Sequence, residues 1–128
     1  MIYGSAAIII EEAKILMVQQ GAEYENLTWT IPSGEKNPEE TFEECCIRET
    51  YEETGLTAII RGKFISKETD TYKIVYYICD KVTGQAMIND PDNLIYDIRW
   101  FSVEELKSLE FSFEEDRKIL SDLLASCQ

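Results

Sequence analysis

The sequence predicts an α+β protein in which helices cover the faces of a mixed β-sheet. Two apolar runs rich in β-branched residues, 2–10 and 72–80, are typical of buried strands. Residues 38–54 carry the end signals of one long helix, and residues 113–126 place apolar side chains at helical spacing. With the shorter elements between them, the predicted order is β-β-β-α-β-β-β-α-α, which favours a sheet with helices packed on it.

The predicted strands follow from apolar patterns bounded by polar turns. Residues 2–10 end at Glu11-Glu12, and the turn there leads into a hairpin partner at 14–19. Further strands are expected at 29–31, 57–66, 72–80 and 97–101, with a turn at 67–70. Residues 21–27 and 83–93 are predicted loops, and the second leaves room for a short strand at 85–88.

Each predicted helix has a recognisable beginning. Asn37 is a suitable N-cap for the helix at 38–54, Pro38 suits its first position, and Glu40 stands where a capping box requires an acidic residue. Gly55 falls where a left-handed residue ends a helix. Ser102 and Ser112 precede helices at 103–109 and 113–126, with Glu105 and Glu115 at the third positions.

Composition limits the classes of function. A chain of 128 residues is expected to form a single domain, 1–128, with a substantial core. Its net charge of −13 and pI near 4.3 argue against nonspecific binding to nucleic acid or to anionic membranes. An anionic substrate is compatible with this charge when a metal ion lies between enzyme and substrate. No membrane span is expected.

Cysteine usage points to a reducing compartment. The four cysteines do not follow a zinc-ligand spacing, and the sequence contains no histidine. Cys45 and Cys46 are neighbours in the predicted helix and cannot pair with each other there. No basic region or long apolar segment follows Met1, so we expect no signal peptide and a cytoplasmic protein with reduced thiols.

The predicted helix at 38–54 gathers acidic side chains at its C-terminal end. Glu49, Glu52 and Glu53 stand at i, i+3 and i+4 and share one face, where each like-charge pair costs roughly 0.2–0.5 kcal/mol. Arg48 is the one cation of this helix and is expected to reach Glu52 and Glu44. Hard divalent ions such as Mg²⁺ prefer oxygen ligands, so the cluster predicts a metal site. The alternative is a structural protein with a solvated acidic face.

The stretch from Gly34 to Leu56, GEKNPEETFEECCIRETYEETGL, resembles the Nudix box, the signature of the Nudix hydrolase superfamily. The resemblance covers Gly34, Glu40, Arg48-Glu49, Glu52-Glu53 and Gly55-Leu56, whereas Thr50 stands where the family usually has a bulky aliphatic residue. It implies an α/β/α sandwich. It also implies that Glu52 and Glu53 bind the metal, that Glu49 is a ligand or the general base, that Arg48 orients these carboxylates, and that the Gly34 carbonyl is a further ligand.

The implied activity is a hydrolysis, dependent on Mg²⁺ or Mn²⁺, of phosphoanhydride bonds in nucleoside diphosphate-linked compounds. The compact length resembles that of MutT-like nucleoside triphosphate pyrophosphohydrolases, so nucleoside triphosphates are our preferred substrate class. Dinucleoside polyphosphates, ADP-ribose and RNA 5′-triphosphate ends are alternatives, as is a non-catalytic nucleotide-binding Nudix module. The expected partner is a small-molecule nucleotide, and the sequence leaves monomer and homodimer open.

Several other residues are candidates for parts of such a site. The family often adds a carboxylate from a later segment, for which Asp97 is the first choice and Asp92, Asp90 and Glu68 are alternatives. Tyr72, sixteen residues after Leu56, is the candidate for stacking on a base. The other aromatic candidates are Tyr3, Trp29, Tyr76, Tyr77 and Trp100, and the candidate phosphate-binding cations are Lys36, Arg61, Lys63 and Lys73.

Overall fold

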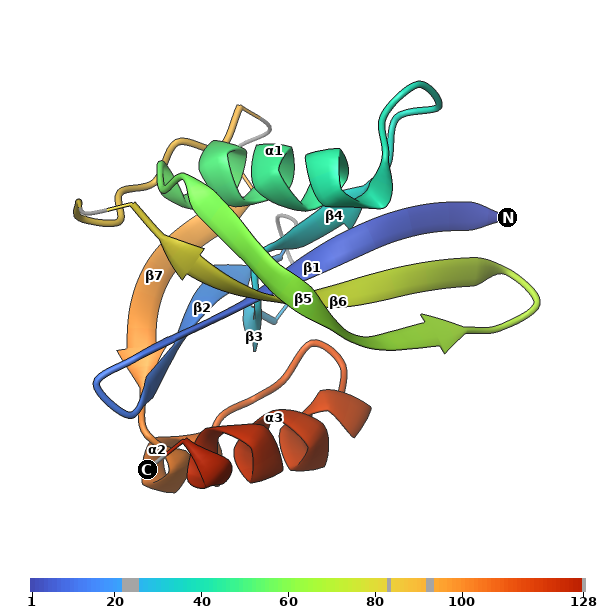
Figure 1. Cartoon of the computed structure of the whole chain (residues 1–128). Helices are drawn as coiled ribbons and strands as arrows, with labels where there is room; N and C mark the ends of the chain where they lie inside the picture. Colours follow the sequence, from blue (N-terminus) through green and yellow to red (C-terminus); the bar gives the residue numbers. More distant parts are fainter. Residues whose placement is uncertain (22–25, 83, 92–93, 128) are drawn as a thin grey trace.

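One mixed sheet lies between two layers of helices (Figure 1). The computed structural model describes residues 1–21, 26–82, 84–91 and 94–127. The strands are β1 (Ile2–Glu11), β2 (Lys14–Gln20), β3 (Thr28–Thr30), β4 (Ser33–Glu35), β5 (Ala58–Glu68), β6 (Tyr72–Lys81) and β7 (Ile95–Phe101). The helices are α1 (Phe42–Thr54), α2 (Val103–Leu106) and α3 (Glu115–Ser126). The predicted α+β class is confirmed.

The sheet is mixed because β1 pairs parallel to β6 and antiparallel to its other partners. Its main path runs β3-β2-β1-β6-β5, while β4 adds to β1 and β7 adds to β2. The register between β1 and β6 sets Ile2 opposite Tyr72 and Ile9 opposite Cys79. This pairing joins segments about 70 residues apart and brings the N-terminal strand beside the strand that carries Tyr72.

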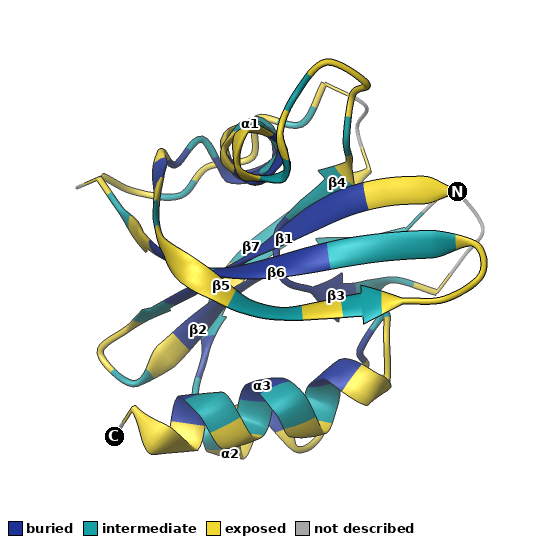
Figure 2. Cartoon of the chain, turned by 45° about the vertical axis from the view of Figure 1, so that its right-hand side comes forward, coloured by how far each residue is buried: buried dark blue, intermediate teal, exposed yellow. Residues whose placement is uncertain are grey.

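The core consists of two apolar layers, one on each face of the sheet. Ala6 and Ile8 of β1 belong to the layer that contains Leu120 and Leu124 of α3. Ala7 and Ile9 belong to the layer that contains Cys46 of α1. Both faces of β1 are therefore buried, which explains the continuous apolar run in the sequence. Figure 2 shows this buried centre of β1 and β6 between the helical layers.

The structure corrects several predicted boundaries. The helix at 103–109 ends at Leu106, although its Ser102 capping box is confirmed. The last helix begins at Glu115 without a side-chain cap, since the Ser112 hydroxyl instead lies 2.7 Å from that of Thr28. Residues 33–35 form the short strand β4, which the sequence analysis did not predict, and residues 85–88 form no strand.

Other boundaries agree with the predictions. The predicted turn after residue 11 is confirmed, with φ of 51° at Glu12 and 62° at Ala13. The predicted loops at 21–27 and 83–93 include residues 22–25, 83 and 92–93, which lie outside the described residues. Within the described ranges, no helix has the length and apolar character needed to cross a membrane.

Candidate active site

The loop before α1 forms a local turn and not the first turn of the helix. The predicted start at Pro38 with Asn37 as N-cap is wrong. The helix begins at Phe42, and Thr41 and Glu44 form a reciprocal capping box. The Glu40 carboxylate accepts from the Asn37 backbone N–H at 2.9 Å and also reaches Arg48. Through these two contacts, Glu40 holds residues 37–40 against the side of α1. The predicted end at Gly55 is confirmed by its φ of 73°.

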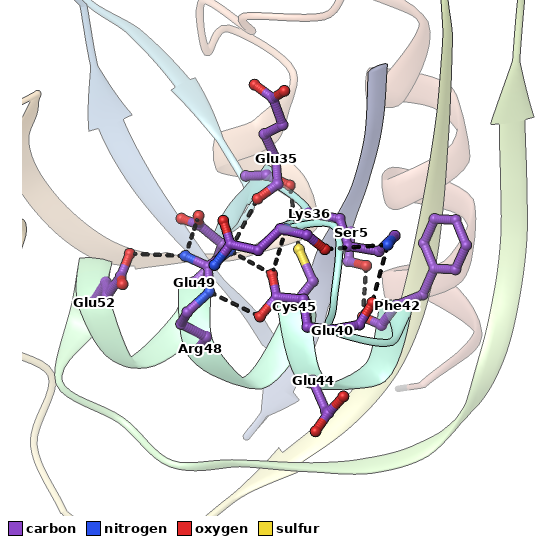
Figure 3. A network of polar contacts seen from close by, with 12 residues as sticks. Ser5, Glu35, Lys36, Glu40, Phe42, Glu44, Cys45, Arg48, Glu49 and Glu52 are labelled. Atoms are coloured by element: carbon purple, nitrogen blue, oxygen red, sulfur yellow. Dashed lines mark hydrogen bonds and ion pairs between the residues drawn. The ribbon is translucent and has the colours of Figure 1, made fainter. Parts of the chain in front are cut away.

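Arg48 is the centre of a network of carboxylates (Figure 3). Its Nη2 and Nε donate to the two carboxylate oxygens of Glu40 at 2.6 and 3.0 Å. Its Nη1 donates to Glu49 Oε1 at 2.8 Å and to Glu52 Oε2 at 3.2 Å. Nη2 also donates to the Glu35 carbonyl at 2.9 Å. The guanidinium thereby joins the loop, β4 and the acidic face of α1 through charge-assisted hydrogen bonds.

Of the two residues that Arg48 was expected to reach, Glu52 is a partner and Glu44 is not, and Glu40, Glu49 and the Glu35 carbonyl are bound as well. Arg48 binds Glu40 and not Glu44, because Glu44 caps the helix through the Thr41 backbone N–H at 2.8 Å. The hydrogen bonds from Arg48 are the main cause that lowers the pKa of Glu40 to about 2. The same hydrogen bonds raise the pKa of Arg48. Both side chains therefore stay charged at neutral pH.

Glu53 is the buried carboxylate of the acidic face, and Glu49 beside it is partly buried. Glu53 is only 7% exposed, and its Oε1 accepts from the Ser33 backbone N–H at 3.2 Å. Burial, followed by the negative charge of Glu49, raises the pKa of Glu53 well above its ordinary value. Burial also raises the pKa of Glu49, and the hydrogen bond from Arg48 opposes that rise. Glu53 is thus a buried carboxylate whose charge Arg48 does not neutralise directly.

Gly34 is packed against the Glu49 side chain and has no room for a Cβ. A Cβ on Gly34 would lie 2.1 Å from the carboxyl carbon of Glu49. Strand β4 is held there by its antiparallel pairing with β1, where Ser5 stands opposite Gly34. The Gly34 carbonyl accepts from Cys45 Sγ at 3.5 Å. A glycine is therefore needed at 34 to let Glu49 lie against the strand.

Gly4 is a supporting residue that the sequence analysis missed. A Cβ at this position of β1 would lie 2.5 Å from the Gly34 carbonyl oxygen. The available signal was a glycine inside an otherwise apolar strand, which often marks a close backbone approach. The two glycines together set the distance between β1, β4 and the acidic face of α1.

The carboxylates have the donor chemistry for a hard divalent cation. All side-chain donors of the face are oxygens, and Glu53 is buried beside a second carboxylate, an arrangement that a cation stabilises. In this arrangement Glu49 and Glu52 point toward Arg48. Accordingly, no group of three or more His, Cys, Asp or Glu side chains within the described ranges is arranged to hold a metal. The carboxylate oxygens of Glu49, Glu52 and Glu53 have the donor chemistry that a hard divalent cation prefers.

The candidate later carboxylates differ in where the structure places them. Asp97 lies on β7, where it accepts from Arg99 Nε at 2.8 Å and from the Ile98 backbone N–H. Asp90 accepts from the Ile95 backbone N–H at 3.0 Å, and its charge contributes to raising the pKa of Glu53. Glu68 ends β5 opposite Lys73. Asp92 lies outside the described residues. Asp90 is thus the candidate with an electrostatic link to Glu53.

The candidate cations have other surroundings. Lys36 Nζ donates to the Asn37 and Glu40 carbonyls, and Lys73 Nζ lies 5.6 Å from the centre of the Phe42 ring. Arg61 pairs with Asp80, and Lys63 is exposed on β5. Of these four cations, Lys36 is therefore the nearest to Glu40 in sequence, and its side chain contacts the loop that carries Glu40.

A pocket of about 280 Å³ adjoins the acidic face, and we call it the β1/β6 pocket. Ser33, Gly34 and Glu35 of β4 line it, and they also contact Glu53, Glu49 and Arg48. Apart from β4, its lining consists of Ile2, Ser5, Ala6, Thr30, Ile31, Lys67, Tyr72, Ile74, Tyr76 and Phe113. Tyr72, the predicted stacking candidate, therefore lines a pocket, together with Lys67 and Phe113, which were not among the predicted site residues.

The remaining aromatic candidates have structural contacts. Trp29 is buried and packs edge-to-face on Phe101, with ring centres 4.8 Å apart. Tyr77 donates to Glu43 Oε1 at 2.8 Å and so ties β6 to the start of α1. Tyr3 lies edge-on to Phe42, and Trp100 lines a second pocket with Lys14 and Lys81. Among the described residues, Tyr72 and Tyr76 are the two tyrosines that line the β1/β6 pocket.

Comparisons with known proteins agree with this architecture. The family model described as NUDIX domain matches residues 2–123. The human protein named nucleoside diphosphate-linked moiety X motif 6 is 27% identical over 115 residues, which are 84% of this chain and 36% of that protein. The chain spans about a third of the length of the curated relatives it matches.

Solved structures show the same fold at low sequence identity. A NUDIX hydrolase from Nitrosomonas europaea has a TM-score of 0.81 at 20% identity, covering 97% of this chain and 88% of that one. A MutT structure, from work on the Aliivibrio salmonicida and Vibrio cholerae proteins, also has a TM-score of 0.81 at 20% identity. It covers 98% of both chains.

Proposed function

Because the chain belongs to the Nudix family, we propose that it is a divalent-metal-dependent hydrolase of phosphoanhydride bonds in nucleoside diphosphate-linked compounds. Nucleoside triphosphates are the preferred substrate class, and their hydrolysis by a pyrophosphohydrolase releases pyrophosphate. The observation that carries the proposal is the buried Glu53 carboxylate beside the partly buried Glu49 carboxylate, next to the β1/β6 pocket. A relative from Caenorhabditis elegans that is named as a nudix hydrolase and is 27% identical over 83% of this chain supports the reaction class.

We assign roles to the carboxylates from their burial and contacts. Glu53 and Glu52 are the proposed side-chain ligands of Mg²⁺ or Mn²⁺, and the Gly34 carbonyl is a further candidate. Glu49 is a ligand or the general base that takes a proton from water, and its raised pKa is compatible with the second role. Among the later carboxylates, the charge effect on Glu53 favours Asp90 over Asp97. A bound divalent ion neutralises phosphate charge and lowers the pKa of a bound water.

Arg48 is the proposed positioning residue of the site. It holds Glu49 and Glu52 from one guanidinium nitrogen, and it is anchored from the other side by Glu40 and the Glu35 carbonyl. This anchoring fixes the direction of Glu49 before substrate binds, whereas Glu52, in its proposed role as a ligand, would exchange Arg48 for the metal. Tyr72 is the proposed stacking residue for the base in the β1/β6 pocket. The protein is proposed to act in a cytoplasm, in keeping with the free thiols of its four cysteines.

The test is a hydrolysis screen with Mg²⁺ and, separately, with Mn²⁺. The panel contains nucleoside triphosphates, dinucleoside polyphosphates, ADP-ribose and RNA with a 5′-triphosphate. We expect metal-dependent release of pyrophosphate from at least one triphosphate, and a loss of activity by orders of magnitude in Glu53→Gln. Glu104→Gln is the matched control, because this side chain is 81% exposed on α2. Metal-dependent nucleotide binding without turnover would support the non-catalytic module instead.

A further inference from the structure

Among the described residues that line the β1/β6 pocket, Lys67 is the only cation. It extends from β5, is 15% exposed, and places Nζ 5.1 Å from the ring centre of Tyr76 and 5.1 Å from that of Phe113. Both rings also line the pocket. The ammonium therefore lies close to two aromatic rings of the proposed base site and is largely shielded from solvent.

Two carboxylates hold this ammonium in place. Nζ donates to Asp116 Oδ1 at 2.9 Å and to Glu115 Oε1 at 3.0 Å. Asp116 is 2% exposed, and the Tyr76 hydroxyl lies 2.9 Å from each of its carboxylate oxygens. Burial acts to lower the pKa of Lys67, but the hydrogen bonds to Asp116 and Glu115 outweigh it and raise the pKa. Lys67 is therefore a charged and fixed donor.

The hydrogen-bond count leaves one donor for a ligand. An ammonium group has three N–H donors, and within the described part of the chain two of them have carboxylate acceptors. Those carboxylates also offset the positive charge, so the remaining N–H suits a neutral acceptor better than a phosphate. The neighbouring walls are mostly apolar, and the Ser5 hydroxyl donates its proton to the Phe42 carbonyl at 2.6 Å.

We propose that Lys67 determines base specificity by donating this N–H to an exocyclic keto oxygen of the nucleobase, and that it disfavours bases with an exocyclic amino group in that place. The inference rests on the proposed nucleotide hydrolysis and adds the choice of base. An amino group would bring its own N–H against the ammonium and leave the donor without an acceptor. Discrimination by a buried donor of this kind is expected to be about ten- to a hundredfold.

The experiment compares triphosphates that differ at one exocyclic position. ITP and ATP differ at position 6 and in the N1 proton, and UTP and CTP differ in the same way at position 4 and N3. We expect kcat/KM to be about ten- to a hundredfold higher for the keto member of at least one pair. In Lys67→Met this ratio should fall to within about threefold of one, through a loss for the keto substrate while the amino substrate changes little.

Control variants separate specificity from folding. Lys118→Met is the matched control, because Lys118 is 86% exposed on α3 and pairs with Asp122. It should keep the wild-type ratio. If Lys67→Met folds poorly, the double variant Lys67→Met with Asp116→Asn removes both charges of the pair and tests the same ratio. A general structural role of Lys67 would lower kcat/KM for both substrates equally, and that result would overturn the proposal.

A binding measurement makes the inference independent of catalysis. Calorimetric titration of IMP and AMP into the wild type and Lys67→Met reports base preference without turnover. Tighter IMP binding that depends on Lys67 supports the specificity role even if no triphosphate is hydrolysed, in which case only the proposed activity fails. Hydrolysis with equal affinities and equal kcat/KM for keto and amino bases refutes the specificity role while the activity stands. Absence of binding by both nucleotides refutes it as well.

Discussion

Replacing Gly34 with alanine tests the contact between β4 and the acidic face of α1. The added Cβ would lie 2.1 Å from the Glu49 carboxyl carbon and 2.3 and 2.4 Å from its oxygens. Ordinary carbon contacts begin near 3.4 Å, so the carboxyl group must move by about 3.4 − 2.1 = 1.3 Å. The end of a flexible side chain can move that far, whereas the backbone of β4 is held by its pairing with β1.

The expected effect is therefore small on stability and large on activity. Moving Glu49 weakens its 2.8 Å ion pair with Arg48, a partly exposed interaction worth about 1 kcal/mol or less. That corresponds to a fall in Tm of a few degrees, about 2–8 °C at most. A displacement of about 1 Å in a catalytic group can lower the rate about a hundredfold. We expect kcat/KM for the triphosphate substrate to fall by about that factor in Gly34→Ala.

Two other glycines supply controls measured in the same assays, thermal unfolding and steady-state hydrolysis. Gly62→Ala should leave Tm and kcat/KM unchanged, because a Cβ there meets nothing within 4 Å. Gly4→Ala should lower stability by about 1–3 kcal/mol, since its Cβ would lie 2.5 Å from a backbone oxygen that cannot swing away. Wild-type turnover in Gly34→Ala would refute the reasoning, because Glu49 would then not need its place beside β4.

Three further outcomes follow from buried charge. The raised pKa of Glu53 means that the folded protein binds more protons than the unfolded chain above about pH 4.5, so stability without metal should fall as pH rises from there toward the folded pKa. In EDTA, the Tm of Glu53→Gln minus that of the wild type should therefore increase as pH rises to 8. An equal pH dependence of both Tm values would contradict this. Mg²⁺ should raise the wild-type Tm, by the equivalent of about 2.7 kcal/mol at a hundred times its Kd, and should do little for Glu53→Gln; a flat wild-type Mg²⁺ titration would count against the metal site. Tyr76→Phe should cost about 1–3 kcal/mol in denaturant unfolding, because the buried Asp116 carboxylate loses its hydroxyl partner; unchanged stability would show that Lys67 alone satisfies it.

The sequence by itself determined the elements whose signals are local. Helical spacing placed Glu49, Glu52 and Glu53 on one face, and Gly55 marked the end of α1, because side-chain direction and left-handed backbone depend on near neighbours. The apolar runs predicted β1 and β6 nearly to their ends. The start of α1 was mispredicted because two capping sequences compete there, and the bond between Glu40 and Arg48 is made across eight residues.

Only the tertiary structure decided which distant groups meet. The parallel pairing of β1 and β6 brings Ile2 beside Tyr72, and it thereby builds a pocket next to β4. Lys67 meets Asp116 across 49 positions of sequence, and Tyr76 meets the same carboxylate across 40. No local pattern encodes such contacts, because they depend on strand register and on how α3 packs against the sheet. The acidic face of α1 could thus be predicted from the sequence, whereas the surroundings that bury Glu53 and fix Lys67 exist only in the folded chain.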